Sequence, residues 1–142
     1  MPTILWVETS AAASLFLDSF ALQPCKVIDK GSQVETANGI RIYDKTLIGF
    51  EVSKADFTEI EKQITEAISF FNDHAVAFAS LFSKDSISAR IDFGFYTTFV
   101  DQKIVVQHDH FPSALLLHLG QLNIDLDLSQ FWYGGQQDLA SI

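Results

Sequence analysis

The sequence predicts an α+β protein, a single domain in which helices pack on a mainly antiparallel sheet. Residues 87–100 alternate apolar and polar side chains, as a half-buried strand does. Residues 55–83 instead carry apolar side chains at steps of three and four, which is typical of an amphipathic helix. Helical and hairpin signals follow one another irregularly, and this favours α+β over a doubly wound α/β fold.

The length and composition fit one domain with one core. A chain of 142 residues and 15.8 kDa buries roughly two-thirds of its extended surface on folding. An apolar fraction of 48% excludes general disorder. We expect residues 1–133 to form the domain and residues 134–142, which begin with Gly134-Gly135, to form a flexible tail.

The charge distribution argues against two classes of partner. The chain has 9 Lys and Arg against 18 Asp and Glu, a net charge of −9. Such a protein repels nucleic-acid backbones and anionic membranes, so we expect neither as a partner. Residues 55–100 hold seven acids and three bases, and residues 101–142 hold five and one, so the second half carries most of the charge.

The cysteine content and the N-terminal sequence predict a cytoplasmic protein. Cys25 is the single cysteine, which excludes an intramolecular disulfide and favours a reducing compartment. The N-terminal residues show no basic segment before Glu8, and no apolar run approaches about 20 residues. Lys26 would lower the thiol pKa of Cys25, but we expect a small, at least half-buried cysteine and not a nucleophile.

The first half of the chain predicts one helix and several short strands. Thr9 or Ser10 can cap a helix over Ala11–Ala21, which Pro24 ends. Asn38-Gly39 is a strong hairpin signal. The expected strands are Ile4–Val7, Lys26–Ile28, Gln33–Thr36, Ile40–Tyr43 and Leu47–Val52.

The second half predicts further helices and strands. The helical spacing from Phe57 to Phe82 is interrupted at Asn72-Asp73, so we expect two helices, 55–71 and 74–83. The other expected elements are a strand over 87–100, a returning strand over Lys103–His108, a helix over Pro112–Leu119 and a strand over 124–129. Gly120 would end the last helix in the left-handed conformation.

Two histidines near the end of the returning strand form a candidate metal site. His108 and His110 are spaced i and i+2, so both point to one face if the strand persists. Asp109, His118 or His74 would have to complete the site, and no spacing requires any of them. We therefore expect a strand end followed by a helix start, with no metal and no cofactor.

Acidic and aromatic residues form the candidate surface for a partner. Asp125 and Asp127 share one face of the last strand, roughly 7 Å apart. Asp92 and Tyr96 lie on the polar face of 87–100, and the run Phe131-Trp132-Tyr133 closes the domain. We expect the partner-binding residues to come from Asp92, Tyr96, Asp125, Asp127, Trp132 and Tyr133. An ordinary solvated sheet face accounts for the same acidic pattern.

No catalytic residues are expected, because the chain has no GxSxG, no HExxH and no glycine-rich phosphate loop. Two segments, "FLDSFALQPCKVIDKGS" (16–32) and "FPSALLLHLGQLNIDLDLSQF" (111–131), resemble a bacterial family known as domain of unknown function number four-two-seven-nine. The resemblance covers residues 10–131, and Phe50 stands where that family has a tryptophan. It implies a small bacterial α+β protein without a recognised active site.

Three functional hypotheses follow. The first is a noncatalytic binding protein of the immunity type that neutralises a basic protein, because an acidic surface accelerates association with a cationic partner. The alternative is a small metal-dependent enzyme that uses His108 and His110 with a metal-bound water as nucleophile. The third is a homodimer formed through the aromatic residues 131–133, so the protein is expected to be a monomer or a homodimer.

Overall fold

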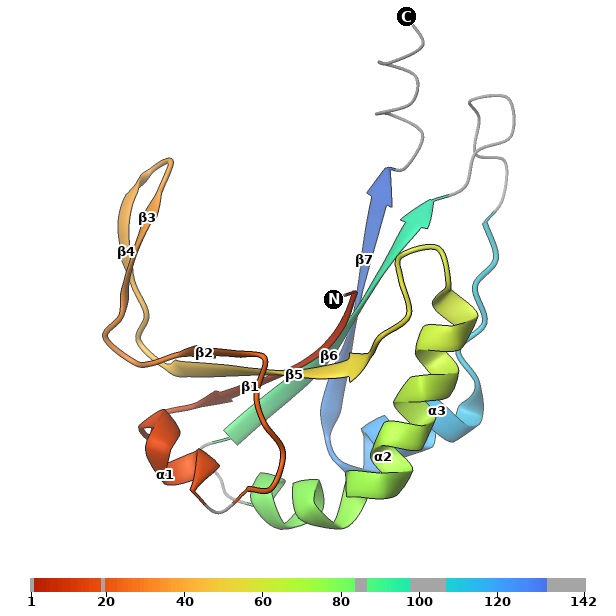
Figure 1. Cartoon of the computed structure of the whole chain (residues 1–142), viewed down its shortest axis with the longest axis horizontal. Helices are drawn as coiled ribbons and strands as arrows, with labels where there is room; N and C mark the ends of the chain where they lie inside the picture. Colours follow the sequence, from red (N-terminus) through yellow and green to blue (C-terminus); the bar gives the residue numbers. More distant parts are fainter. Residues whose placement is uncertain (1, 19, 84–86, 98–106, 133–142) are drawn as a thin grey trace, which may run out of the picture.

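The expected fold class is confirmed. A computed structural model describes residues 2–18, 20–83, 87–97 and 107–132, with helices packed on a five-stranded, mainly antiparallel sheet (Figure 1). The strands are β1 (Thr3–Thr9), β2 (Lys26–Ile28), β3 (Gln33–Thr36), β4 (Gly39–Ile42), β5 (Thr46–Ser53), β6 (Ile87–Thr97) and β7 (Ile124–Trp132). The helices are α1 (Ala13–Leu17), α2 (Ile60–Phe82) and α3 (Ser113–Gln121).

The sheet is built around β1, in the order β2-β5-β1-β6-β7. Both β5 and β6 run antiparallel to β1, and α2 connects them across the sheet. β6 and β7 are parallel neighbours. A parallel pair needs a long crossover, and α3 lies in the connection from β6 to β7. β7 is the last strand in the sheet order, so it lies at one edge of the sheet.

The core lies between one face of the sheet and α2. Alternate residues of the central strands point into it, including Leu5, Ile48, Phe50, Ile91 and Phe93, all no more than 1% exposed. Phe71 and Phe78 of α2 pack there as well. Phe20 contacts Phe50 and Phe78, with ring centroids 5.6 and 5.1 Å apart, so the segment after α1 covers the same face. In Figure 1, α1 lies below the strands at the lower left, and α2 and α3 lie at the lower right.

A buried glutamine joins the helix layer to the strand ends. Thr3 Oγ1 donates to Gln63 Oε1 at 2.7 Å. Gln63 Nε2 donates to the carbonyls of Asp56 and Gly94 at 2.8 and 2.9 Å. Because each amide atom is satisfied, this fully buried polar side chain is tolerated in the core.

β3 and β4 form a separate hairpin that projects from the body (Figure 1). Gly39 at its turn has φ +115°, a conformation that favours glycine. Every residue of the two strands is exposed. An isolated two-stranded hairpin is only marginally stable in water, so its base must be held by contacts with the rest of the chain.

The prediction of two helices between 55 and 83 was wrong, because α2 is continuous. Asn72 and Asp73 lie in its interior, but both side chains are exposed. An unfavourable residue on the solvent side costs only about 0.5 kcal/mol of helix propensity. The continuous apolar face, with Ile64, Phe71 and Phe78 in the core, outweighs that cost.

Other boundaries also differ from the expectation, and three of them change how the chain is connected. α1 covers only Ala13–Leu17, and its first amide is capped from a distance, because Ala13 N donates to Asp29 Oδ1 at 3.2 Å. Gly120 lies inside α3, and the left-handed residue is Asn123 with φ +55°. Asn tolerates that conformation better than most residues. Residues 107–112 have no regular secondary structure, and positions 103–106 of the expected returning strand lie outside the described residues.

Candidate partner-binding face

The candidate site is the sheet face opposite the helices, which we call the open face. Its side chains alternate with the core side chains along each strand. They include Ile4, Trp6 and Glu8 of β1, Leu47 and Glu51 of β5, Arg90, Asp92 and Tyr96 of β6, and Asp125, Asp127, Ser129 and Phe131 of β7. The described helices all pack on the other face, so this one is left uncovered by them.

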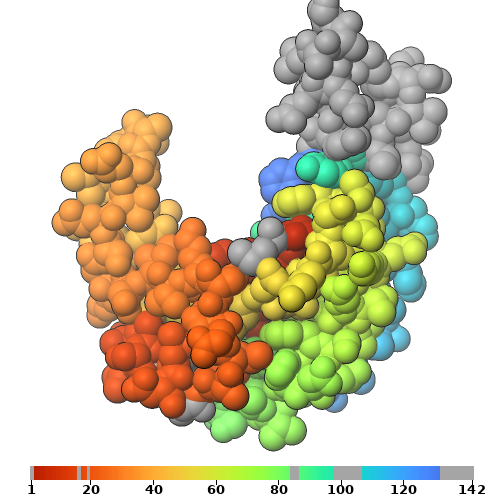
Figure 2. Space-filling model, in the orientation of Figure 1, coloured from red at the N-terminus to blue at the C-terminus, as the bar shows by residue number. Residues whose placement is uncertain are grey.

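The open face forms the floor of a hollow. Figure 2 shows this hollow between the orange β3–β4 hairpin and the yellow segment that precedes α2. A cavity at the hairpin base includes Glu8 and Leu47 of the open face. A second cavity, on the other side, includes Glu51 and Phe57. The open face is therefore bordered by protein on two sides.

A row of acidic side chains crosses β1, β6 and β7. Asp92 pairs in register with Asp127, and the neighbouring pair is Arg90 with Asp125. The row holds four acids, Glu8, Asp92, Asp125 and Asp127, against Arg90, which gives a net charge of −3. Like charges on neighbouring strands repel each other. A positively charged group bound beside the row would reduce this repulsion.

Arg90 and Ser129 hold this acidic row in place. Arg90 Nη1 lies 3.2 Å from Glu8 Oε1, and Arg90 Nε lies 3.4 Å from Asp127 Oδ2. Ser129 Oγ donates to Asp92 Oδ1 at 2.7 Å. Asp125 is exposed and has no ion-pair partner within the described part of the chain. The row is thus ordered but not neutralised.

An aromatic cluster of Phe57, Tyr96 and Phe131 ends the acidic row. The Phe57 ring centroid lies 5.2 Å from that of Tyr96 and 5.4 Å from that of Phe131. Gly94 makes room for it, because a Cβ there would lie 3.0 Å from Phe57 Cε1. Phe131 is 47% exposed. The cluster therefore combines partly exposed aromatic surface with adjacent negative charge.

The sequence did not identify Phe57 as part of this site, because helical spacing placed it on the core face of a helix. In the structure it precedes α2, in a turn where Thr58 N donates to Asp56 Oδ1 at 2.8 Å. Two hydrogen bonds from Thr58 hold the pKa of the Asp56 carboxyl below its ordinary value. The Asp-x-Thr spacing, which favours such a local turn, was the signal that could have separated Phe57 from the helix.

Trp6 forms the centre of the open face. A Cβ on Gly49 of the neighbouring strand would lie 2.7 Å from Trp6 Cζ3, so the indole lies directly on that glycine. A glycine in a strand interior often marks such a close approach. Trp6 is half-buried and adds aromatic surface beside the acidic row.

Four of the six expected partner-binding residues, Asp92, Tyr96, Asp125 and Asp127, meet on the open face. The backbone of Trp132 ends β7 opposite Thr97, and its side chain lies outside what the structure describes. Tyr133 lies outside the described residues altogether, as does the expected tail, 134–142.

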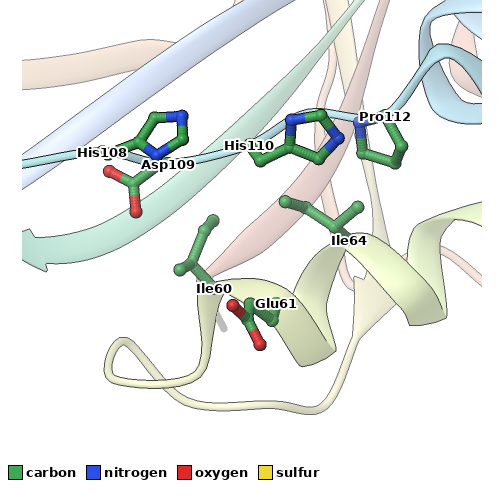
Figure 3. A pocket seen from close by; sticks show the side chains of 7 residues that line it. All are labelled: Ile60, Glu61, Ile64, His108, Asp109, His110 and Pro112. Carbon is green, nitrogen blue, oxygen red and sulfur yellow. The ribbon is translucent and has the colours of Figure 1, made fainter.

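The histidine pair lies elsewhere, beside the first turns of α2 (Figure 3). A cavity of about 370 Å³ is lined by Ile60, Glu61, Ile64, His108, Asp109, His110 and Pro112. Both imidazoles are exposed. Asp109 Oδ2 accepts a hydrogen bond from Gln107 Nε2 at 3.0 Å. In Figure 3 the imidazoles and the carboxylates do not converge on one point.

The candidate third ligands of a metal site are engaged in other contacts. His118 Nε2 lies 2.9 Å from Asn72 Oδ1, two turns along α2 from Ile64, and its ring stacks on Phe71. The ring centroid of His74 lies 5.0 Å from that of Phe70. Within residues 2–18, 20–83, 87–97 and 107–132, no three His, Cys, Asp or Glu side chains are grouped closely enough to hold a metal ion.

Cys25 is exposed, contrary to the expectation of an at least half-buried residue. It precedes the three-residue strand β2, and its Sγ donates to the carbonyl of Gly49 at 3.3 Å. Partial desolvation of the thiol raises its pKa above the ordinary value, and Lys26 opposes that shift only weakly. A thiol with a raised pKa has less reactive thiolate at neutral pH.

Comparison with known proteins gives no match to a family model, to a curated protein or to a solved structure. None of the helices in the described part is long and apolar enough to cross a membrane.

Proposed function

We propose that the protein is a noncatalytic binding protein of the immunity type, which captures a basic protein on its open face. The observation that carries this proposal is the sheet face that the described helices leave uncovered, where an acidic row of net charge −3 adjoins the Phe57, Tyr96 and Phe131 cluster. In this proposal the host is a bacterium and the protein is cytoplasmic, in keeping with the family resemblance and the single cysteine.

The two parts of the face would make different contributions to binding. Complementary charge increases the rate of encounter and disfavours acidic competitors. Aromatic side chains that become fully desolvated supply much of the binding energy in protein interfaces. The hollow between the hairpin and the segment before α2 would allow a convex, basic surface to reach both parts.

A charge-matched pair of double variants tests the proposal. The tagged full chain captures a partner from a lysate of the native host, and mass spectrometry identifies it. Affinity for the purified partner is then measured for Asp125→Asn/Asp127→Asn and for Asp18→Asn/Asp73→Asn. Both variants remove two exposed carboxylates, but Asp18 follows α1 and Asp73 lies on α2.

We expect the open-face variant to weaken binding about tenfold or more at low salt and the control to change it less than about twofold. An equal loss of affinity in both variants would mean that the partner is attracted by the net charge of the whole protein and not by the open face. The proposal would be overturned if only acidic partners were recovered. It would also be overturned if no recovered partner bound the two variants with different affinity.

The alternative function, a small metal-dependent enzyme, would use the cavity at His108 and His110, where two carboxylates also line the wall. Within the described residues no third ligand is grouped with the two histidines, so a metal there would need a ligand from elsewhere. Elemental analysis of the purified chain, and its thermal stability with and without zinc, test this alternative. Stoichiometric metal that is lost in His108→Ala/His110→Ala would support the enzyme. Absence of metal, with zinc leaving the stability of both proteins unchanged, would exclude it.

A further inference from the structure

A second site lies at the base of the β3–β4 hairpin, where the hairpin meets the open face. A cavity of about 210 Å³ is lined by Glu8, Arg41, Tyr43, Asp44, Lys45, Leu47 and Arg90. Three of the nine basic residues of the chain line this one cavity, against two acids. Glu8 and Arg90 also belong to the acidic row, and without this shared pair Arg41 and Lys45 outnumber Asp44 by one positive charge, in a protein whose net charge is −9.

The three cations differ in whether the described residues pair them with a carboxylate. Arg90 is already bound to Glu8 and Asp127. Arg41 and Lys45 form no ion pair within the described part of the chain. The Arg41 guanidinium carbon lies 5.0 Å from the Tyr43 ring centroid. Stacking on an aromatic face positions the guanidinium and leaves its N–H donors available.

The chain holds the base of the hairpin in place. Gly31 N donates to the Tyr43 carbonyl at 2.8 Å, and Tyr43 N donates to the Ser32 carbonyl at 3.0 Å. Lys30 N donates to Thr46 Oγ1 at 3.2 Å, which links the same base to β5. Arg41 and Lys45 flank this anchored segment, so their charges are presented from a fixed backbone and not from the hairpin tip.

We propose that this cavity binds an oxyanion, either a carboxylate or a phosphate group, between Arg41 and Lys45. The planar guanidinium matches the two oxygens of a carboxylate or phosphate, and the ammonium adds a point charge. Leu47 supplies an apolar wall. This site has the opposite sign to the acidic row, so it adds a ligand class that the proposed function does not include.

The oxyanion has two sources, and the experiment separates them. A small free anion would bind to the isolated protein as a metabolite or as inorganic phosphate. An acidic side chain of a bound protein would present the same carboxylate at the edge of the open face. Only the second source depends on the proposed function.

Nuclear magnetic resonance titration of the full ¹⁵N-labelled chain tests the site. Sodium phosphate and a blocked glutamate dipeptide are titrated separately at constant ionic strength against sodium chloride. We expect saturable shifts at the backbone amides of residues 41–47 and at the Arg41 Nε–H group. Tighter binding of the dipeptide would favour a side chain of a partner, and tighter binding of phosphate would favour a free small anion.

Three single variants complete the test. Arg41→Gln and Lys45→Gln should each weaken the apparent affinity about fivefold or more. Lys62→Gln on α2 removes the same charge from an exposed site elsewhere and should leave the affinity unchanged. Chemical-shift changes that are absent, that do not saturate, or that are spread over the whole surface would contradict the proposed oxyanion site. An equal effect of Lys62→Gln on the affinity would contradict it as well. All three side chains are exposed, so the variants are expected to fold.

Discussion

The two faces of the sheet are made by the same strands and differ in almost every property. On the helix side, Leu5, Ile91 and Phe93 are fully buried in a continuous apolar core. On the open side, the residues next to them in sequence, such as Trp6, Arg90 and Asp92, are only half-buried. One face therefore holds the buried apolar core, and the other carries charged and partly exposed aromatic side chains.

This division depends on the period of the strand. Because successive side chains alternate, a shift of register by one residue would exchange the two faces completely. Burying Arg90 and Asp92 against α2 would require desolvating charges without partners, which costs several kcal/mol per charge. The strong contrast between the faces therefore excludes a one-residue shift of β6 between β1 and β7.

The largest expected difference between the faces comes from removing one phenylalanine from each. Phe78 is 0% exposed in the core, so Phe78→Ala should lower the free energy of unfolding by about 3–5 kcal/mol. Phe131 is 47% exposed on the open face, and Phe131→Ala should cost only about 1 kcal/mol. Urea denaturation followed by circular dichroism measures both. Similar losses would mean that the open face is buried against part of the chain.

The sequence pattern predicted the two faces of a single strand better than it predicted the length of the helix. The alternation of 87–97 correctly separated Ile91 and Phe93 from Arg90 and Asp92, because a strand leaves only two directions for a side chain. The prediction of a helix break at Asn72-Asp73 was wrong, because the helix propensity of two residues contributes less free energy than burial of the continuous apolar face of α2. Local pattern was sufficient where a single element decides the outcome.

The composition of the site depends on pairing between distant segments, and no local pattern reports that pairing. Asp92 lies beside Asp127 only because β6 and β7 are parallel neighbours. The cavity at the hairpin base brings Arg41 near Arg90 across about fifty residues of chain. Strand order and register determine both arrangements, and they arise from tertiary packing.

A smaller effect is expected at the contact between Trp6 and Gly49. A Cβ on residue 49 would lie 2.7 Å from Trp6 Cζ3, so Gly49→Ala must displace the indole. Because Trp6 is half-buried and can move outward, we expect a loss of about 1 kcal/mol, at the low end of overpacking costs. Trp6 should also become more exposed, which a red shift in tryptophan fluorescence would report in a Trp132→Phe background.

Serine at position 49 provides the matched control for that substitution. Its Cβ creates the same conflict, so Gly49→Ser should reproduce the spectral shift. If Gly49→Ala shifts the emission and Gly49→Ser does not, the change arises from something other than the displaced ring. A variant as stable as the wild type, with unchanged emission, would contradict the close approach and with it the central position of Trp6 on the open face.

The smallest effect concerns a carboxyl at the boundary between the faces. Ser53 Oγ donates to Glu66 Oε2 at 2.8 Å, joining the end of β5 to α2. This hydrogen bond holds the pKa of Glu66 below its ordinary value of 4.5, and a weaker hydrogen bond from Lys54 N lowers the pKa in the same direction. Because the folded-state pKa is depressed, the contribution to stability is present above pH 4.5 and is lost as the pH falls through the folded-state pKa.

Ser53→Ala should therefore return the pKa of Glu66 towards 4.5, as measured by ¹³C chemical shifts of the side-chain carboxyl. Glu61 on the same helix serves as an internal reference, because Ser53 does not contact it. The difference in unfolding free energy between wild type and Ser53→Ala should narrow below pH 4.5 as Glu66 becomes protonated in both proteins. A difference that widens on acidification would reverse the sign of the linkage and show that Ser53 stabilises the protonated carboxyl instead.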